Sequence, residues 1–415
     1  MTGRRRHLQE DEVSEHNEAL LDNDLERLGS EALDLLAKKL AEDEKALGLE
    51  FPVVTAPDGC WATAPASESA GYRGDAWSHG NWHCGFLVGL HLAAHVHTGA
   101  SRFLLWARER MRLVAQRSED PNTHDIGFIF DSSAIPAFFI TQEQWFAEVA
   151  LQAACRLRAR LVTTPLGAYL SSWGPMSDPR GRRSSAIDTM ANLPLLYWAS
   201  SFSGDASFRL VADAHAAFTK RGFVRADYST FHAVEYDERT GHRVRGYTFQ
   251  GYADDSAWSR GQTWAIYGYA QSARETRKIE YLQLADRLAT YYFKRLGDDP
   301  VPPWDFDAPK SSDNPKDSAA AAIIASALFD LSNLHPEKDL AADYRRKCSW
   351  IVQSLCTDYL AREDTHRGLL KHGCYSKPHN EGVDSATMFG DFFFTEVLCK
   401  LLHAGRFRPQ SPSVF

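Results

Sequence analysis

The stretch Gly246-Tyr-Thr-Phe-Gln-Gly-Tyr-Ala-Asp-Asp-Ser-Ala-Trp-Ser-Arg-Gly-Gln-Thr-Trp-Ala-Ile-Tyr-Gly-Tyr-Ala270 leads from a glycine-rich loop into an apolar helix. The polar residues 254–256 are all good N-cap residues, so the helix is predicted to begin there. Arg260 and Trp264 lie four residues apart and therefore share one helical face, with Gln250 in the preceding loop. A guanidinium group beside an indole near a helix N-terminus suits a ligand with a flat apolar face and a carboxylate. The alternative is a buried aromatic helix whose arginine is paired internally, and this stretch alone leaves both open.

Junctions of this kind, between a polar loop and an apolar helix, recur along the whole chain. They fall at Trp82, Asp125, Asp188, Asp255, Asp317 and Asp391. The last five are 63, 67, 62 and 74 residues apart, and amphipathic helical patterns lie between them. This spacing predicts about six helical hairpins, with buried inner helices and wetter outer ones. Such a repeat closes naturally into an all-α toroid whose inner helices start at one rim, with one short β-hairpin expected near residues 231–247.

The toroid is predicted to be a single domain. Residues 1–20 are charged and are expected to form a flexible N-terminal segment, whereas residues 21–415 contain no stretch of linker composition. An amphipathic helical pattern begins at Leu21 and continues to Leu47. We therefore expect one domain over residues 21–415.

Composition argues against several classes of function. The 415 residues include 46 basic and 54 acidic side chains, for a net charge of −8, and no basic block favours nucleic acid. No apolar run approaches the roughly 18 residues of a membrane span. The seven cysteines lack the spacing of a disulfide framework, and the N-terminus lacks the apolar core of a secretory signal. These patterns predict a cytoplasmic protein with reduced thiols and no membrane or nucleic-acid partner, and they do not indicate an oligomeric state.

A shared rim would gather a set of polar and aromatic side chains. These are Trp77, His124, Asp125, Trp173, Asp188, His232, Gln250, Arg260 and Trp264. Two carboxylates, several aromatic rings and few lysines suit sugar chemistry, because indole faces stack on pyranose rings and carboxyl groups exchange protons. Aspartates at helix starts are more often caps, and that is the role expected of Asp255, Asp317 and Asp391. Asp125 and Asp188 are each followed by apolar residues, so each is either a catalyst or a paired core residue.

Motifs for metals and cofactors are weak. His91 and His95 have the i, i+4 spacing of a helical metal site, but the glutamate of the zincin arrangement is missing. No phosphate-binding glycine motif and no nucleophile elbow occurs. A solvent-facing or packed role for these histidines is therefore favoured over a metal site.

Four segments carry a resemblance to a known family. They are His124-Asp-Ile-Gly-Phe128, Ala186-Ile-Asp-Thr-Met-Ala-Asn-Leu-Pro-Leu-Leu196, residues 251–268 and Lys316-Asp-Ser-Ala-Ala320. In this order they resemble the unsaturated glucuronyl hydrolases, glycoside hydrolase family 88, and the resemblance extends from about Trp77 to the segment Gly390-Asp-Phe-Phe-Phe394. The resemblance implies a six-hairpin (α/α)6 barrel, in agreement with the repeat.

The resemblance also implies an activity. Members of the family remove the 4,5-unsaturated glucuronic acid from the non-reducing end of lyase-generated di- and oligosaccharides. They hydrate the vinyl ether: an acid protonates C4, water adds at C5, and the resulting hemiketal collapses. By resemblance, Asp188 is the general acid and base, and Asp125 is the second acidic residue, which holds ring hydroxyls and stabilises positive charge at C5. Substrate-binding positions fall on Trp77, His124, Trp173, His232, Gln250, Arg260 and Trp264. Arg260 would then pair with the uronate carboxylate, and no metal or cofactor is implied.

Some positions depart from the family pattern. Ala191 replaces a common methionine, Phe249 stands where a small or polar residue is usual, and His83-Cys84 is atypical. Two alternatives remain: an unsaturated rhamnogalacturonyl hydrolase of the same fold, and a catalytically silent carbohydrate-binding toroid. The presence of Asp188 argues against the silent toroid, because a binding protein would not need it. The parent polysaccharide is not indicated by the sequence.

Overall fold

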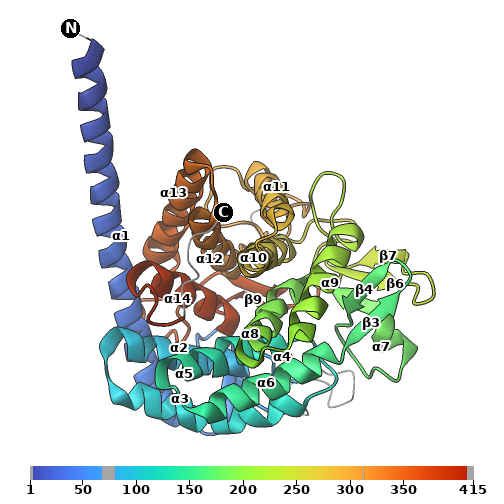
Figure 1. Ribbon diagram of the computed structural model, residues 1–415. Coiled ribbons are helices and arrows are strands. Elements are labelled where there is room, and N and C mark those ends of the chain that lie inside the picture. Colours follow the sequence, from blue (N-terminus) through green and yellow to red (C-terminus); the bar gives the residue numbers. More distant parts are fainter. Residues whose placement is uncertain (1–2, 68–79, 312, 409–415) are drawn as a thin grey trace.

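The computed structural model describes residues 3–67, 80–311 and 313–408, with side chains from Asn23 onward. Its helices form two concentric rings (Figure 1). The inner ring consists of α2 (Cys84–Thr98), α4 (Ile126–Ser132), α8 (Leu193–Ser203), α10 (Ser259–Thr276), α12 (Ser318–Leu334) and α14 (Met388–Leu402). Each inner helix contacts the next one in this order, and α14 contacts α2, so the ring is closed.

The outer ring packs each inner helix against an amphipathic partner. Its members are α3 (Ser101–Val114), α6 (Gln144–Arg158), α9 (Ala206–Gly222), α11 (Ile279–Leu296), α13 (Lys338–Ser354) and α1 (Gly3–Leu47). Because α1 contacts α14, the N-terminal helix supplies the sixth outer element. The short helix α5 (Ala134–Thr141) continues α4 and packs on α6. The α/α barrel predicted from the repeat is therefore confirmed.

Side-chain size explains the two rings. Residues 318–331 of α12 are buried all round, and their run of alanines lets α10 and α14 approach closely on either side. In α11, by contrast, buried leucines and tyrosines occupy one face while charged residues occupy the other. An inner helix thus has no polar face, and an outer helix covers it.

Short antiparallel sheets occupy the connections between helices. They pair β1 (Glu50–Thr55) with β2 (Trp61–Pro65), β3 (Leu161–Thr164) with β4 (Gly167–Leu170), and β8 (Gly373–Ser376) with β9 (Glu381–Ser385), and they join β5 (Ser184–Ala186), β6 (Ala233–Tyr236) and β7 (Arg243–Tyr247) in one three-stranded sheet. The hairpin predicted near residues 231–247 is β6–β7 and is confirmed. The other sheets were not predicted, because their strands are only three to six residues long and carry no clear alternation.

The helix starts agree with the expected junctions, but two of the predicted caps are wrong. Asp317 caps α12 by accepting the N–H of Ala320 at 3.3 Å, as predicted. Asp255 is exposed in a turn before α10, which begins only at Ser259. Asp391 lies inside the first turn of α14, whose cap is Thr387. Its buried carboxylate instead accepts the N–H groups of residues 369 and 370, which ties that loop to the helix.

Helix α1 is longer than the sequence pattern predicted. It begins at Gly3 rather than Leu21, and in Figure 1 its N-terminal part extends away from the barrel. The flexibility expected for residues 1–20 and the single-domain assignment stay predictions. In the described part of the chain, no helix combines the length and apolar composition that a membrane span requires.

Candidate active site

Two carboxylates meet at the rim because two inner elements approach closely. Asp125 directly precedes α4, and Asp188 lies in the 3-10 helix η2 (Ile187–Asn192) that leads into α8. A Cβ added to Gly127 would lie 2.4 Å from Cβ of Asn192, so only glycine allows this approach. Asn192 then fixes both sides: its Oδ1 accepts the N–H of Phe128 at 2.5 Å, and its Nδ2 donates to the carbonyl oxygen of Asp188 at 3.1 Å.

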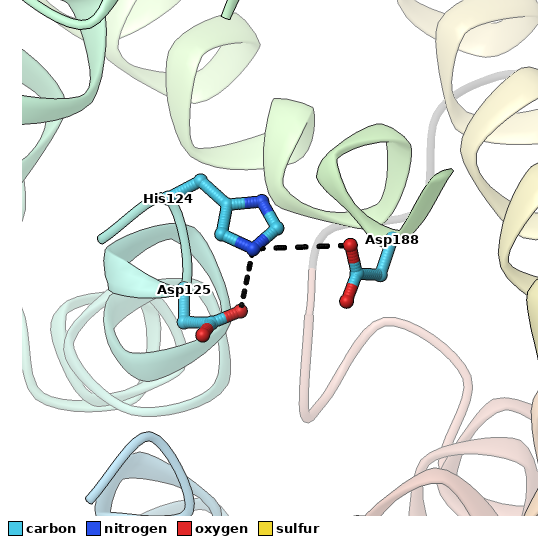
Figure 2. Close-up of side chains that lie close together, drawn as sticks. All are labelled: His124, Asp125 and Asp188. Atoms are coloured by element: carbon cyan, nitrogen blue, oxygen red, sulfur yellow. Dashed lines mark ion pairs between the residues drawn. The ribbon is translucent and has the colours of Figure 1, made fainter. Parts of the chain in front are cut away.

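His124 lies between the two carboxylates. Its Nε2 is 3.3 Å from Asp125 Oδ1 and 3.8 Å from Asp188 Oδ1, and Figure 2 shows the imidazole facing both groups. The His124 side chain is fully buried, whereas 18 % of the Asp188 side chain is exposed. A ligand can therefore reach Asp188, whereas His124 is covered and contacts both carboxyl groups from inside the protein.

A chain of hydrogen bonds ends at the imidazole of His124. Ser172 Oγ accepts the N–H of Ala186 at 2.8 Å and lies 3.1 Å from Thr189 Oγ1, which lies 2.6 Å from His124 Nδ1. Because Nε2 faces carboxyl oxygens of Asp125 and Asp188, we infer that it carries the proton, so that Nδ1 accepts the Thr189 O–H and Thr189 Oγ1 accepts the Ser172 O–H.

Asp188 is held in an environment that favours its protonated form. Burial raises the pKa of Asp188 well above its usual range, and the nearby Asp125 raises it further. Hydrogen bonding to the backbone and the positive charge of Arg260 only partly oppose this rise. Its Oδ1 is buried and receives no hydrogen bond from the described residues. Asp125 differs, since its Oδ2 accepts a hydrogen bond from Thr123 Oγ1 at 3.2 Å. The pair thus combines a proton donor with a second carboxyl group.

Arg260 is placed by the structure in an internal network. Only 2 % of the side chain is exposed, and its Nη1 lies 2.6 Å from Asp317 Oδ2. The same guanidinium group donates to the carbonyl oxygens of Cys374 and Tyr375 at 2.6 Å. These contacts favour the internally paired alternative over the predicted contact with the uronate carboxylate. Arg260 joins the starts of α10 and α12 to strand β8.

An aromatic wall extends from the carboxylates along the rim. The Trp173 ring meets the His124 ring edge-on at 5.7 Å and the Phe249 ring at 5.0 Å, and Phe249 in turn contacts His232 at 4.8 Å. Burial lowers the pKa of His232 to about 3, with Arg260 and His124 adding to the effect, so its ring is neutral at physiological pH. The structure thus brings Trp173 and His232 together with the carboxylates, as the sequence predicted.

Of the remaining predicted site residues, one is hydrogen-bonded within the protein, one lies in the barrel core and one lies outside the described residues. Gln250 is half-buried, and its Nε2 donates to the carbonyl oxygen of Tyr375 at 3.1 Å. Trp264 is 2 % exposed and packs 5.0 Å from the rings of Phe128 and Phe393, which places it in the barrel core. Trp77 lies outside the described residues. No observation of this structure tests the substrate-binding roles of these residues, which stay predictions.

Sequence reasoning missed several residues that shape the site. Thr189 and Asn192 belong to a segment that carried the family resemblance, yet no role was assigned to either. Phe249 was noted only as a departure from the family pattern. Ser172 stands beside Trp173 in a loop without helical or strand periodicity, so no sequence signal could have identified its hydrogen bond to Thr189.

Among the described residues, one group of side chains could hold a metal ion. His124, Asp125 and Asp188 could offer one nitrogen and two carboxylate oxygens, all within 4.8 Å of one another. Nitrogen and oxygen ligands of this kind suit several divalent metals. A metal would, however, have to displace the proton that we infer on His124 Nε2.

Comparison with known proteins identifies the family. No protein-family model matches the chain. The chain is 31 % identical to the unsaturated glucuronyl hydrolase of Bacillus sp. (strain GL1) over 373 residues, which are 89 % of this chain and 95 % of that protein. This chain belongs to the unsaturated glucuronyl hydrolase family. It is also 30 % identical to the unsaturated chondroitin disaccharide hydrolase of Streptococcus pyogenes serotype M1, over 89 % of this chain and 90 % of that protein.

Solved structures give the same result for the fold. The crystal structure of the unsaturated glucuronyl hydrolase from Bacillus sp. GL1 matches with a TM-score of 0.82 and 29 % identity, covering 91 % of this chain and 98 % of that one. A mutant of the Streptococcus agalactiae enzyme, complexed with dGlcA-GalNAc6S, matches with a TM-score of 0.75 and 26 % identity, covering 90 % and 91 %. The present unsaturated glucuronyl hydrolase is therefore a glycoside hydrolase built on an (α/α)6 barrel.

Proposed function

We propose that this enzyme removes the 4,5-unsaturated glucuronic acid from lyase-generated oligosaccharides, with Asp188 as general acid and base and Asp125 as the stabilising carboxylate. The observation that carries this proposal is the pair of carboxyl groups around His124. Asp188 favours its protonated form, and Asp125 lies beside it as the second carboxyl group. A solvent-accessible carboxyl group that keeps its proton is the group that vinyl-ether hydration requires.

The proposed reaction uses the Asp188 carboxyl group twice, first as an acid and then as a base. The protonated carboxyl group of Asp188 transfers its proton to C4, and positive charge develops at C5 and the ring oxygen. The Asp188 carboxylate then takes a proton from a water molecule as the water oxygen bonds to C5. The acid is thereby regenerated, and the hemiketal at C5 collapses to release the remaining sugar. No bond between enzyme and substrate forms in this scheme.

Asp125 and His124 support the charge that develops at C5. The Asp125 side chain is 4 % exposed and receives a hydrogen bond from Thr123, and in the proposed scheme it is the anion beside the reacting ring. The N–H at His124 Nε2 faces Asp125 Oδ1 at 3.3 Å and orients that oxygen. Electrostatic stabilisation of this kind is strong in a buried site, because little water screens it.

The aromatic wall supports an unsaturated glucuronyl substrate. The C4=C5 bond flattens the terminal ring, and the Trp173 and Phe249 rings offer apolar surface beside the carboxylates. Homologous structures were solved with dGlcA-GalNAc6S and with dGlcA-Glc-Rha-Glc, both of which carry this terminal sugar. We propose an unsaturated glucuronyl di- or oligosaccharide as the substrate. The experiment below also includes an unsaturated rhamnogalacturonyl substrate, which tests the alternative.

Ultraviolet absorbance gives the direct test, because hydration destroys the conjugated C4=C5 uronate chromophore. The purified enzyme is incubated with unsaturated glucuronyl and rhamnogalacturonyl disaccharides, sulfated and unsulfated. We expect absorbance to fall with at least one glucuronyl substrate. A response limited to the rhamnogalacturonyl substrate would replace the substrate assignment, and folded enzyme without any response would support the silent toroid.

We also propose a cytoplasmic location. All seven cysteines are free thiols, and five of them are buried, as suits a reducing compartment. Fractionation of the native host with an antibody against the enzyme tests this assignment, and recovery in the extracellular fraction would contradict it.

A further inference from the structure

A cavity lies at the same end of the barrel as the catalytic pair. Helices α8 and α9 are joined by the short turn at 204–205, so the C-terminal end of α9 returns to the rim from which α8 starts. There the end of α9, the β3–β4 turn and the β6–β7 turn enclose a cavity of about 230 Å³. Arg221, His242 and Arg243 line it, and none of its described lining residues is acidic.

The wall of this cavity contains a buried hydroxyl group. Tyr236 is 1 % exposed, and among the described residues no group forms a hydrogen bond with its hydroxyl. The ring is held by Tyr169 and Phe218, at centroid distances of 4.5 and 5.0 Å. The hydroxyl lies against Gly222, where an added Cβ would be only 1.8 Å from its oxygen. An O–H buried without an acceptor costs stability.

Both arginines are positioned by backbone carbonyl groups. Arg221 Nη1 donates to the carbonyl oxygen of Leu166 at 3.0 Å, and Arg243 Nη1 donates to that of Gly222 at 2.8 Å. The Arg243 guanidinium also lies over the Phe231 ring at 4.6 Å. A guanidinium group has five N–H donors, so one such bond fixes its direction and leaves others to bind a ligand. Fixed forks of this kind match the geometry of an oxyanion.

We propose that this cavity binds an oxyanion, namely a sulfate or carboxylate group on a distal sugar of an oligosaccharide whose unsaturated end occupies the catalytic site. This inference rests on the proposed function. Strand β6 links the two sites: His232 directly precedes the strand and Tyr236 ends it, which corresponds to about 13 Å along the strand. A disaccharide would occupy the catalytic site alone, whereas a longer chain would reach both sites.

Thermal unfolding in sodium sulfate tests anion binding independently of catalysis. The probe is inorganic sulfate, compared with sodium chloride at equal ionic strength. We expect sulfate to raise the melting temperature of the wild type, and we expect Arg221→Gln and Arg243→Gln to abolish this rise. Lys220→Gln is the matched control, because Lys220 is an exposed cation next to Arg221 that does not line the cavity. Without sulfate, Tyr236→Phe should unfold at the wild-type temperature or above it.

Kinetics with longer substrates distinguish a free anion from a group on the sugar chain. With a sulfated unsaturated tetrasaccharide, Arg221→Gln should raise KM about tenfold and leave kcat unchanged, since one charge-assisted contact is lost. The kinetics of the unsaturated disaccharide should not change. If desulfation removes the effect, the bound group is the sulfate; if the effect persists, it is a carboxylate.

Two results would overturn the proposal. One is an equal response of Arg221→Gln and Lys220→Gln to sulfate, which would reduce the effect to general surface charge. The other is an unchanged KM for every tetrasaccharide, which would leave at most a site for a free anion. Failure of the proposed function can be told apart from failure of this proposal. In that case no substrate would lose absorbance, but the sulfate experiment would still show whether the cavity binds an anion.

Discussion

Both ends of the barrel bury carboxyl groups, but the pKa is raised at one end and lowered at the other. At the rim, burial and the neighbouring Asp125 raise the pKa of Asp188. At the other end, Glu396 is 1 % exposed; burial alone would raise its pKa, yet the charges of Lys400 and Arg408 and a hydrogen bond from Ser326 outweigh this and lower it. Burial is therefore not sufficient to make a proton donor, because the neighbouring charges decide the sign of the shift.

The network at the far end is nearly self-satisfied. Ser326 Oγ donates to Glu396 Oε2 at 2.6 Å, and Lys400 and Arg408 each approach Glu396 to 3.6 Å. Each cation also has a second carboxylate partner at 2.8 Å, Asp330 for Lys400 and Asp131 for Arg408. These groups surround a cavity of about 620 Å³ formed by the C-terminal halves of the inner helices. The carboxylate of Glu396 is held by these charges, whereas Asp188 at the rim favours its proton and is available for chemistry.

Removing the proton donor should have the largest effect on activity. Asp188→Asn keeps the shape of the side chain but removes the transferable proton, so we expect kcat to fall about 10³-fold while the substrate still binds. Absorbance kinetics and a binding isotherm measure the two quantities. Asp255→Asn is the control, because Asp255 is exposed in the turn before α10. Near-wild-type turnover in Asp188→Asn would disprove the assigned role.

Stability should respond in the opposite order. Glu396→Gln leaves Lys400 and Arg408 with one buried carboxylate each, so we expect the free energy of unfolding to fall by about 2 kcal/mol. Asp188→Asn should leave stability unchanged or raise it at neutral pH, because it replaces a buried carboxyl group that resists ionisation. Denaturant unfolding of the two variants measures both effects. Equal destabilisation by the two substitutions would remove the contrast between the ends.

The pH dependence sharpens the same comparison. The pKa of Glu396 is lowered in the folded state, so its contribution is present above the ordinary glutamate pKa and is lost as pH falls through the lowered value. The stability difference between the wild type and Glu396→Gln should therefore shrink in acid. A difference that grows as pH falls would mean that Glu396 is protonated in the folded enzyme.

A smaller effect is expected from the hydrogen-bond chain behind His124. Thr189→Val removes the hydroxyl that contacts His124 Nδ1 at 2.6 Å, and we expect kcat to fall about tenfold with little change in KM. Thr395→Val is the matched control, because Thr395 Oγ1 is buried without a hydrogen-bond partner among the described residues. Similar turnover in the two variants would show that the tautomer of His124 does not depend on Thr189.

The barrel was predictable because its cause is local and repeated. The junctions at Asp125, Asp188 and Asp317 each mark a loop that enters an apolar helix, and that pattern can be read without knowing any long-range contact. The pairing of Arg260 was not predictable, since its partner Asp317 is 57 residues away and nothing near Arg260 identifies it. A helix that carries an arginine on its buried face predicts a partner but does not name it.

The site was predictable in its carboxylates and incomplete in its surroundings. Asp125 and Asp188 stood out because each occurs in a loop next to apolar residues, a costly place for a charge. Their support comes from Ser172 and Asn192, whose hydrogen bonds join segments 14 to 64 residues apart. Hydroxyl and amide side chains are common in loops, so sequence patterns do not distinguish those that orient a catalytic group.

A carboxyl titration of Asp188 by carbon-13 NMR tests the central claim most directly, namely that the rim holds this residue protonated for transfer. Wild-type enzyme labelled at aspartate, compared with Asp188→Asn to assign the signal, should show one carboxyl group that titrates well above the ordinary aspartate pKa. In Asp125→Asn the same group should titrate at lower pH, since a repelling negative charge has been removed. An Asp188 signal that titrates in the ordinary range, or that does not shift in Asp125→Asn, would contradict the account.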